Sequence, residues 1–175
     1  MKKYISILFV FGFLFFFQSC SSQSTVDSKT VDAWVSSQEF TFHAQRANPT
    51  NYDVINLMNS MPNATSTRML ELDANYTVEL RSNTLDVVLP YFGRSFRPNY
   101  NNDNSYRFVS KDFTVNKSQN KKGNWVVRIK PNDVKDVTEI IIEVFKNGKA
   151  FTSMRSTDRQ PISYDGYISM NETKL

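Results

Sequence analysis

The sequence has few of the residues that enzymes use for covalent or metal chemistry. Among its 175 residues it has one cysteine, one histidine and five glycines. A Ser-His-Asp triad would have to use His43, and no Gly-x-Ser-x-Gly turn is present to supply its nucleophile. One histidine and one cysteine are too few for a typical zinc site, and no glycine-rich phosphate loop occurs. We therefore expect a protein that is not an enzyme and that holds no metal and no other cofactor.

The sequence also lacks a strong excess of positive or of negative residues. The chain has 21 Lys and Arg against 17 Asp and Glu, and removing Lys2 and Lys3 with the N-terminal segment leaves 19 against 17. The basic residues are scattered along the sequence, with Lys121-Lys122 as the densest point. We therefore expect no nucleic-acid partner, since such proteins gather their basic residues on one face.

A hydrophobic run long enough to span a membrane is absent as well. The longest run, Ile5–Phe17, is shorter than the roughly 20 residues that a spanning helix needs, and it follows the basic residues Lys2 and Lys3. A short basic segment followed by a short apolar one is typical of an export signal. We predict a signal peptide over residues 1–19.

The single cysteine, Cys20, follows this signal directly. The segment Phe17–Cys20 resembles the bacterial lipobox Leu-x-(Ala/Ser/Gly)-Cys, with phenylalanine in place of leucine. The resemblance implies lipid attachment at Cys20, which makes the membrane a partner through the anchor and residues 20–26 a lipidated polar tether. A free or disulfide-linked thiol is the alternative, because a lone cysteine in an exported chain otherwise needs a partner in another molecule.

The tether has no acidic residue before Asp27. Surface-exported lipoproteins of Bacteroidetes-type bacteria tend to carry acidic residues just after the cysteine. By this resemblance we expect an outer-membrane lipoprotein of the cell envelope that faces the periplasm.

The remaining residues, 27–175, are predicted to form a single domain that begins with one short helix. Val31, Trp34 and Val35 have the spacing of one helix face, and Ser24 or Thr25 is a possible N-cap. Residues after this helix show apolar and polar side chains in alternation, which is typical of strands.

The clearest strand pair turns at Ser82-Asn83. With this turn Leu80 faces Leu85 and Val78 faces Val87 on one apolar side of the hairpin. A slip by one residue would turn these side chains to the wrong face, so the register is well specified.

Other strands are predicted from similar patterns. One begins at Phe40 and stops near Asn48-Pro49, a long loop follows over Asn51–Thr67 because of its Pro and Asn content, and the last strand covers Ile162–Ile168. Two further hairpins turn at Lys121–Asn124 and at Asn147-Gly148, the second being a dipeptide typical of a type I′ turn. The strand before that turn, Ile140–Phe145, is apolar on both faces and is expected to be covered on both.

Short strands joined by Gly and Asn turns, without helices between them, predict a mainly β fold. We expect one antiparallel domain, either barrel-like or a sandwich, with a short N-terminal helix. Two strings, LPYFG at residues 89–93 and ISYDG at residues 162–166, together with FTFHA at 40–44, resemble a Bacteroidetes-type family of small lipoproteins classed only as a domain of unknown function. The resemblance covers nearly all of the chain after the signal and implies a lipocalin-like β barrel, but no activity and no catalytic residues.

One cluster of side chains stands out as a candidate for binding a ligand or a partner. Pro90 ends a predicted strand and Gly93 permits a sharp turn, so the aromatic residues here could lie at an open barrel end. The alternative is that the first two of them plug that end as part of the core. The candidates are Tyr91, Phe92, Arg94 and Tyr100.

The lack of catalytic groups and the predicted β shell together favour a noncatalytic role. We expect the protein to bind a small or apolar ligand. The alternative is a structural or protein-interaction module that docks another protein of the cell envelope.

Overall fold

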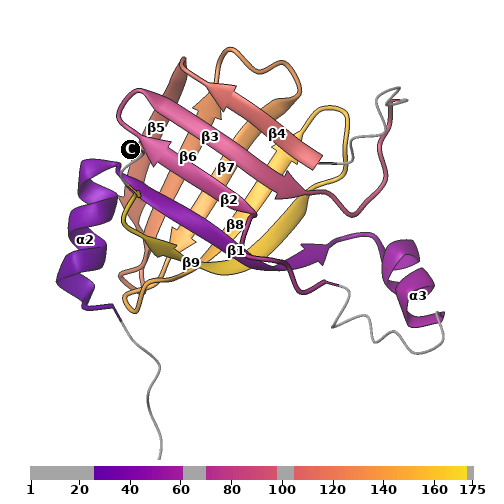
Figure 1. The fold of residues 1–175 in the computed structure, drawn as a ribbon, viewed down its shortest axis with the longest axis horizontal. Coiled ribbons are helices and arrows are strands. Elements are labelled where there is room, and N and C mark those ends of the chain that lie inside the picture. The colour runs from indigo at the N-terminus through magenta and orange to yellow at the C-terminus, as the bar shows by residue number, and fades with distance from the viewer. Residues whose placement is uncertain (1–25, 61–69, 98–104, 173–175) are drawn as a thin grey trace, which may run out of the picture.

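The computed structural model describes residues 26–60, 70–97 and 105–172, and it confirms the mainly β fold as a nearly closed antiparallel barrel (Figure 1). Cys20, the predicted signal peptide and all but the last residue of the tether lie outside the described residues. Within them, no helix is both long and apolar enough to cross a bilayer. The elements are α2 (Ser28–Ser37), β1 (Phe40–Pro49), α3 (Tyr52–Ser60), β2 (Thr77–Arg81), β3 (Thr84–Pro90), β4 (Ser105–Ser110), β5 (Phe113–Gln119), β6 (Trp125–Pro131), β7 (Val137–Val144), β8 (Lys149–Ser156) and β9 (Ile162–Ser169).

The strands follow one another around the barrel in the order β4-β3-β2-β1-β9-β8-β7-β6-β5, and every neighbouring pair is antiparallel. The first strand, β1, therefore lies in the middle of the order, between β2 and the last strand, β9. In Figure 1, β2, β3 and β4 cross in front of β5 to β8. The barrel is not fully closed, because β4 and β5 are the two ends of the sheet although they are consecutive in the sequence.

Loop contacts bridge this incomplete closure. The Asp133 carboxylate, in the loop after β6, accepts hydrogen bonds from the Ser110 hydroxyl and from the backbone N–H groups of Lys111, at 2.9 Å, and Asp112, at 3.3 Å. These donors, Ser110 first, lower the pKa of Asp133. The link between β4 and β5 is thus held against the loop between β6 and β7.

The predicted register of the β2–β3 hairpin is confirmed. Leu80 pairs with Leu85 and Val78 with Val87, and all four side chains are fully buried. The alternation of apolar and polar residues was sufficient to specify the register of this strand pair, because a shift by one residue would expose the apolar side chains to solvent.

The predicted hairpin at Asn147-Gly148 is confirmed, but the prediction of a type I′ turn is wrong. Only Gly148 of the two has a positive φ, of 80°. The Gly148 N–H donates to the Phe145 carbonyl at 3.0 Å, and the Phe145 N–H donates to the Lys149 carbonyl at 2.8 Å. The connection is therefore a four-residue turn that ends on a left-handed glycine, a geometry that also fits the twist of a hairpin. The strand before it, β7, lies inside the sheet between β6 and β8. Its inward face is buried, but Glu139, Ile141 and Glu143 on the other face are only half-buried, so the expected cover of both faces is incomplete.

The short N-terminal helix is confirmed as α2, which buries Val31 and Val35. Its N-cap is Asp27, without a side-chain cap, rather than Ser24 or Thr25. The start of α2 covers one end of the barrel. A Cβ on Gly148, in the turn between β7 and β8, would lie 3.3 Å from the side chain of Val26, which directly precedes α2.

The loop expected over Asn51–Thr67 is wrong for its first part, which forms α3. The Asn51 side chain accepts a hydrogen bond from the Asp53 N–H at 2.9 Å, and the Asn51 carbonyl accepts one from Ile55. Asparagine, taken as a loop signal, here caps a helix. Figure 1 shows α3 extending away from the barrel beyond the end of β1.

Inward side chains fill the barrel. Because a side chain with almost no accessible area has no space for water beside it, these residues form a packed core and not the wall of a cavity. The side chains with at most 1% exposure on the strands include Phe40, Phe42, Val78, Leu80, Leu85, Val87, Leu89, Val127, Ile129, Ile140, Ile142, Val144, Met154, Ile162, Tyr164 and Ile168.

Candidate binding site at the Tyr91 corner

The chain turns sharply after β3, as Pro90 and Gly93 predicted. The Tyr91 hydroxyl reaches over this turn and donates to the Arg94 carbonyl at 2.8 Å. Gly93 lies directly under the ring, and a Cβ there would be 2.5 Å from the hydroxyl oxygen. Glycine is thus required at this position for the ring to fold back on its own turn.

A second segment, the loop between β8 and β9, lies against this turn. The Phe96 N–H donates to the Asp158 carbonyl at 2.7 Å, and the Gln160 N–H donates to the Arg94 carbonyl at 3.2 Å. Ser95 and Arg159 form an isolated antiparallel bridge. We call these two segments, residues 91–97 and 157–161, the Tyr91 corner.

Arg159 contacts two aromatic rings, Tyr91 of this corner and Tyr106 of β4. Its guanidinium carbon is 5.1 Å from the centre of the Tyr91 ring and 4.9 Å from that of Tyr106 on β4, and the two rings meet edge to face at 5.6 Å. One guanidinium N–H donates to the Ser105 carbonyl at 3.0 Å. Asp158 Oδ2 lies 3.5 Å from the Arg159 Nε. Cation–π contacts and the carboxylate together hold the positive charge in a largely buried position.

Tyr164 supports the corner from inside the barrel. Its hydroxyl donates to the Pro90 carbonyl at 2.6 Å, so β9 is tied to the end of β3. Burial raises the pKa of Tyr164 and, by the same cause, those of Tyr106 and Tyr91. All three phenols therefore stay protonated at neutral pH and do not act as bases, and those of Tyr91 and Tyr164 donate hydrogen bonds.

Two buried oxygens at this corner have no hydrogen-bond partner among the described residues. They are Asp158 Oδ1 and Gln160 Oε1, on either side of Arg159. A third such atom, Thr152 Oγ1, lies in the middle of β8, before the chain reaches the corner. Folded proteins satisfy nearly all buried acceptors, so each of these oxygens calls for a donor beyond the described residues, either a water molecule or another group.

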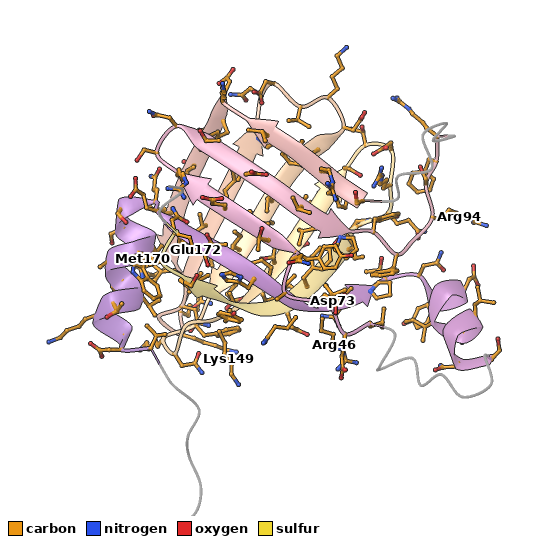
Figure 2. All side chains as sticks on the ribbon, viewed as in Figure 1. Arg46, Asp73, Arg94, Lys149, Met170 and Glu172 are labelled. Atoms are coloured by element: carbon orange, nitrogen blue, oxygen red, sulfur yellow. The ribbon has the colours of Figure 1, made fainter. Side chains whose placement is uncertain are left out.

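The structure brings only part of the predicted cluster together. Tyr91 is 7% exposed and Phe92 is half-buried against the core, whereas the Arg94 side chain points away from the barrel (Figure 2). Tyr100 lies outside the described residues. Tyr91 and Phe92 thus lie in or against the core, as the alternative interpretation expected. Their role in binding stays a prediction.

Sequence reasoning missed Tyr106, Arg159 and the two unpartnered oxygens. Tyr164 was within the ISYDG string, but nothing in the string indicated that its hydroxyl reaches Pro90. These groups meet only because β4 and the β8–β9 loop are neighbours in the folded barrel.

Hollows on the outside of the barrel include two that are lined by described residues. One, of about 690 Å³, lies beside the β7–β8 turn between Gln45, Phe145, Lys149 and Asp165. The other, of about 610 Å³, lies between Trp34 on α2 and the residues after β9, including Met170 and Glu172, which Figure 2 labels.

His43 lies on the outer side of β1. Its ring stacks on Tyr167 at 4.9 Å and its Nε2 is 2.8 Å from the Ser169 hydroxyl. Burial lowers the pKa of His43, and the Glu172 carboxylate partly opposes this. Across the described ranges, no three His, Cys, Asp or Glu side chains are grouped so that they could hold a metal ion.

These features define a small β-barrel domain with a packed interior and a polar corner. The chain belongs to the family described as Domain of unknown function (DUF4251), which it matches over residues 22–168. This membership confirms the resemblance to a Bacteroidetes-type family of unknown function.

Among solved structures, the chain is similar to the crystal structure of a DUF4251 family protein from Bacteroides eggerthii DSM 20697. The two share 12% sequence identity with a TM-score of 0.53, over 84% of this chain and 89% of that chain. At this identity the similarity supports the fold alone. No curated protein matches the chain.

Proposed function

We propose that the protein is a noncatalytic binding protein of the bacterial cell envelope, held to the outer membrane by lipid at Cys20 and facing the periplasm. Its ligand is a small molecule with hydrogen-bond donors, and it binds at the Tyr91 corner. The packed core argues against a ligand deep inside the barrel, because the inward side chains leave no space beside them.

One observation carries this proposal. Asp158 Oδ1 and Gln160 Oε1 are both buried without a partner among the described residues, and both flank Arg159. A ligand that donates to these two oxygens would satisfy them, and an aromatic or apolar part of it could contact Phe96, which is 62% exposed.

Native mass spectrometry of the full acylated chain, purified from its host membranes in mild detergent, tests this function. We expect a bound small molecule on the wild-type chain. Asp158→Ala and Gln160→Ala should each lower its occupancy roughly tenfold, because each removes one acceptor from a buried hydrogen bond. Asp136→Ala and Gln119→Ala remove the same groups from exposed positions and should leave the occupancy unchanged. Equal occupancy in all variants, or no bound molecule, would refute binding at this corner.

The lipid anchor is tested separately. Mass spectrometry of the N-terminal peptide should find acyl chains on Cys20, and Cys20→Ser should move the protein from the membrane to the soluble fraction. An unmodified Cys20 in the wild-type protein contradicts the anchor without affecting the ligand proposal.

A protein-interaction module is the second candidate, and the ends of the sheet favour it. The strands β4 and β5 are not hydrogen-bonded to each other, so each has an edge that could accept a strand from another protein. A photo-crosslinking amino acid in place of Gln119, on β5, should then capture one envelope protein, and one in place of Lys130, on β6, should not. The same product from both positions speaks against strand addition.

A further inference from the structure

Four lysines that are scattered in the sequence meet at one end of the barrel. Lys121 and Lys122 lie in the turn between β5 and β6, and Lys146 and Lys149 lie in or beside the turn between β7 and β8. All four are exposed. We call this surface the lysine end.

The two turns are direct neighbours. A Cβ on Gly123, in the first turn, would lie 3.1 Å from Lys146 Cε and 3.2 Å from its Nζ, in the second. The strand pairing gives the same result, because Trp125 at the start of β6 pairs with Val144 at the end of β7. The four ammonium groups therefore belong to one surface.

Acidic side chains near this surface are occupied by other donors. Glu143 accepts hydrogen bonds from the side chains of Asn120 and Asn124, each at 2.8 Å. Asp165 accepts one from Asn48 at 2.8 Å, and Asp32 accepts one from the Trp125 indole at 2.6 Å. Within the described part of the chain, the lysine end has no ion pair. Glu143, Asp165 and Asp32 keep their negative charge because these donors are neutral, but none of them forms an ion pair with the four lysines. The lysine ammonium groups can therefore contact an external anion.

The chain enters the domain at this same end. A Cβ on Gly148 would lie 3.3 Å from the side chain of Val26, so the start of α2 touches the β7–β8 turn. Figure 2 shows Lys149 on the side of the barrel where α2 begins. Val26 is the sixth residue after Cys20, and six extended residues reach at most about 20 Å.

We propose that the lysine end docks on the anionic phospholipid headgroups of the membrane that holds Cys20. The proposal rests on the lipid anchor proposed above. The short tether keeps the lysine end within about 20 Å of the headgroups, and clustered lysines near an anionic membrane surface are attracted to it over about one Debye length. Docking in this orientation directs the Tyr91 corner away from the membrane, because β8 runs from Lys149 at the lysine end to Ser156 beside the corner.

Surface labelling of the full acylated chain tests the docking. The chain is added to preformed vesicles of phosphatidylcholine, either alone or mixed with phosphatidylglycerol, and the lysines are modified with a water-soluble amine reagent and quantified by peptide mass spectrometry. We expect the modification rates of Lys121, Lys122, Lys146 and Lys149 to fall roughly threefold or more on the phosphatidylglycerol vesicles only. High salt should remove this protection.

The opposite end of the same strands supplies the control. Lys111, Lys130 and Lys135 are also exposed, but they lie where β5 begins, where β6 ends and before β7 begins. Their rates should be the same on both kinds of vesicle. Charge reversal by Lys146→Glu with Lys149→Glu should abolish the protection of Lys121 and Lys122, whereas Lys130→Glu with Lys135→Glu should leave it intact.

Flotation of the same samples separates the two proposals. A chain that floats with both kinds of vesicle but is labelled equally on each overturns the docking and leaves the anchor. Equal protection at the two ends of the barrel also overturns the docking. A chain that does not float with the vesicles overturns both.

Discussion

At the α2 end of the barrel, the closing side chains are apolar or small, whereas at the Tyr91 corner they are tyrosines and an arginine. Val31 and Val35 of α2 are buried at the first end, and Val31 lies beside Gly148. At the second, Arg159 contacts the rings of Tyr91 and Tyr106, and two nearby oxygens have no partner in the described part of the chain.

This difference assigns stability to one end of the barrel and the proposed binding to the other. Apolar burial stabilises the folded state without the need for a specific partner, while a buried polar group stabilises it only when its hydrogen bonds are made. We therefore expect substitutions at the α2 end to change the free energy of unfolding strongly, and substitutions at the corner to have smaller effects on it.

The largest effect is expected for Gly166→Ala, on β9 near the α2 end. The new Cβ would lie 1.9 Å from the His43 carbonyl oxygen, which belongs to the backbone of β1 and cannot move aside without breaking strand pairing. Overpacking of this kind should lower the free energy of unfolding by about 3 kcal/mol, measured by urea denaturation. Gly93→Ala at the corner meets only the Tyr91 side chain, which can shift, and should cost about 1 kcal/mol through the lost hydrogen bond. An equal loss in the free energy of unfolding for both variants would contradict the proposed difference between the two ends of the barrel.

A second test of the α2 end is Val35→Ala. Val35 is fully buried, so the loss of its two methyl groups and the space left behind should cost about 2 kcal/mol. Val109→Ala makes the same change at a side chain that is 54% exposed and should cost less than about 0.5 kcal/mol. Thermal and urea unfolding followed by tryptophan fluorescence would measure both.

Alkaline pH should weaken the corner through its tyrosines. Because burial raises the pKa of Tyr164 in the folded protein, its contribution is complete below the unfolded pKa near 10 and is lost as the pH rises above it. The free energy of unfolding should then fall by up to about 1.4 kcal/mol per pH unit for this residue. Tyr164→Phe should make that fall shallower and should cost about 1 kcal/mol at pH 7, because the Pro90 carbonyl loses its donor.

The smallest effect is expected at acid pH from His43. Burial lowers the pKa of His43, so its stabilising contribution is present above about pH 6.5 and is lost as the pH falls through the folded value. NMR titration of this single histidine should give a pKa below that of a free imidazole. Glu172→Gln removes the carboxylate that opposes the shift and should lower the pKa further. A normal pKa in the wild-type protein contradicts the partial burial of the ring.

The fold was predictable where local alternation and turn residues agreed. The β2–β3 register followed from four apolar residues around Ser82-Asn83, and the final strand followed from its alternation. The type of the β7–β8 turn was not predictable from Asn147-Gly148, because the same dipeptide fits two loop lengths. Helix α3 was missed because Asn51 can cap a helix as well as open a loop.

The candidate site was less predictable than the fold. Tyr91 stood out because Pro90 and Gly93 surround it, but the residue that contacts its ring, Arg159, is distant in the sequence and lies in a loop without a pattern of its own. The lysine end shows the same limit. Basic residues that look scattered along the chain become one surface only after two hairpin turns are placed side by side.

The position of β1 in the strand order has a consequence for when the barrel can form. β1 pairs with β9 from Thr41 to Pro49, but with β2 only from Phe40 to His43. Because most of the strand pairing of β1 is with β9, β1 can form most of its backbone hydrogen bonds only after β9 has been synthesised. Contacts between such distant segments slow folding, and the barrel closes around its core only after β9 has been synthesised.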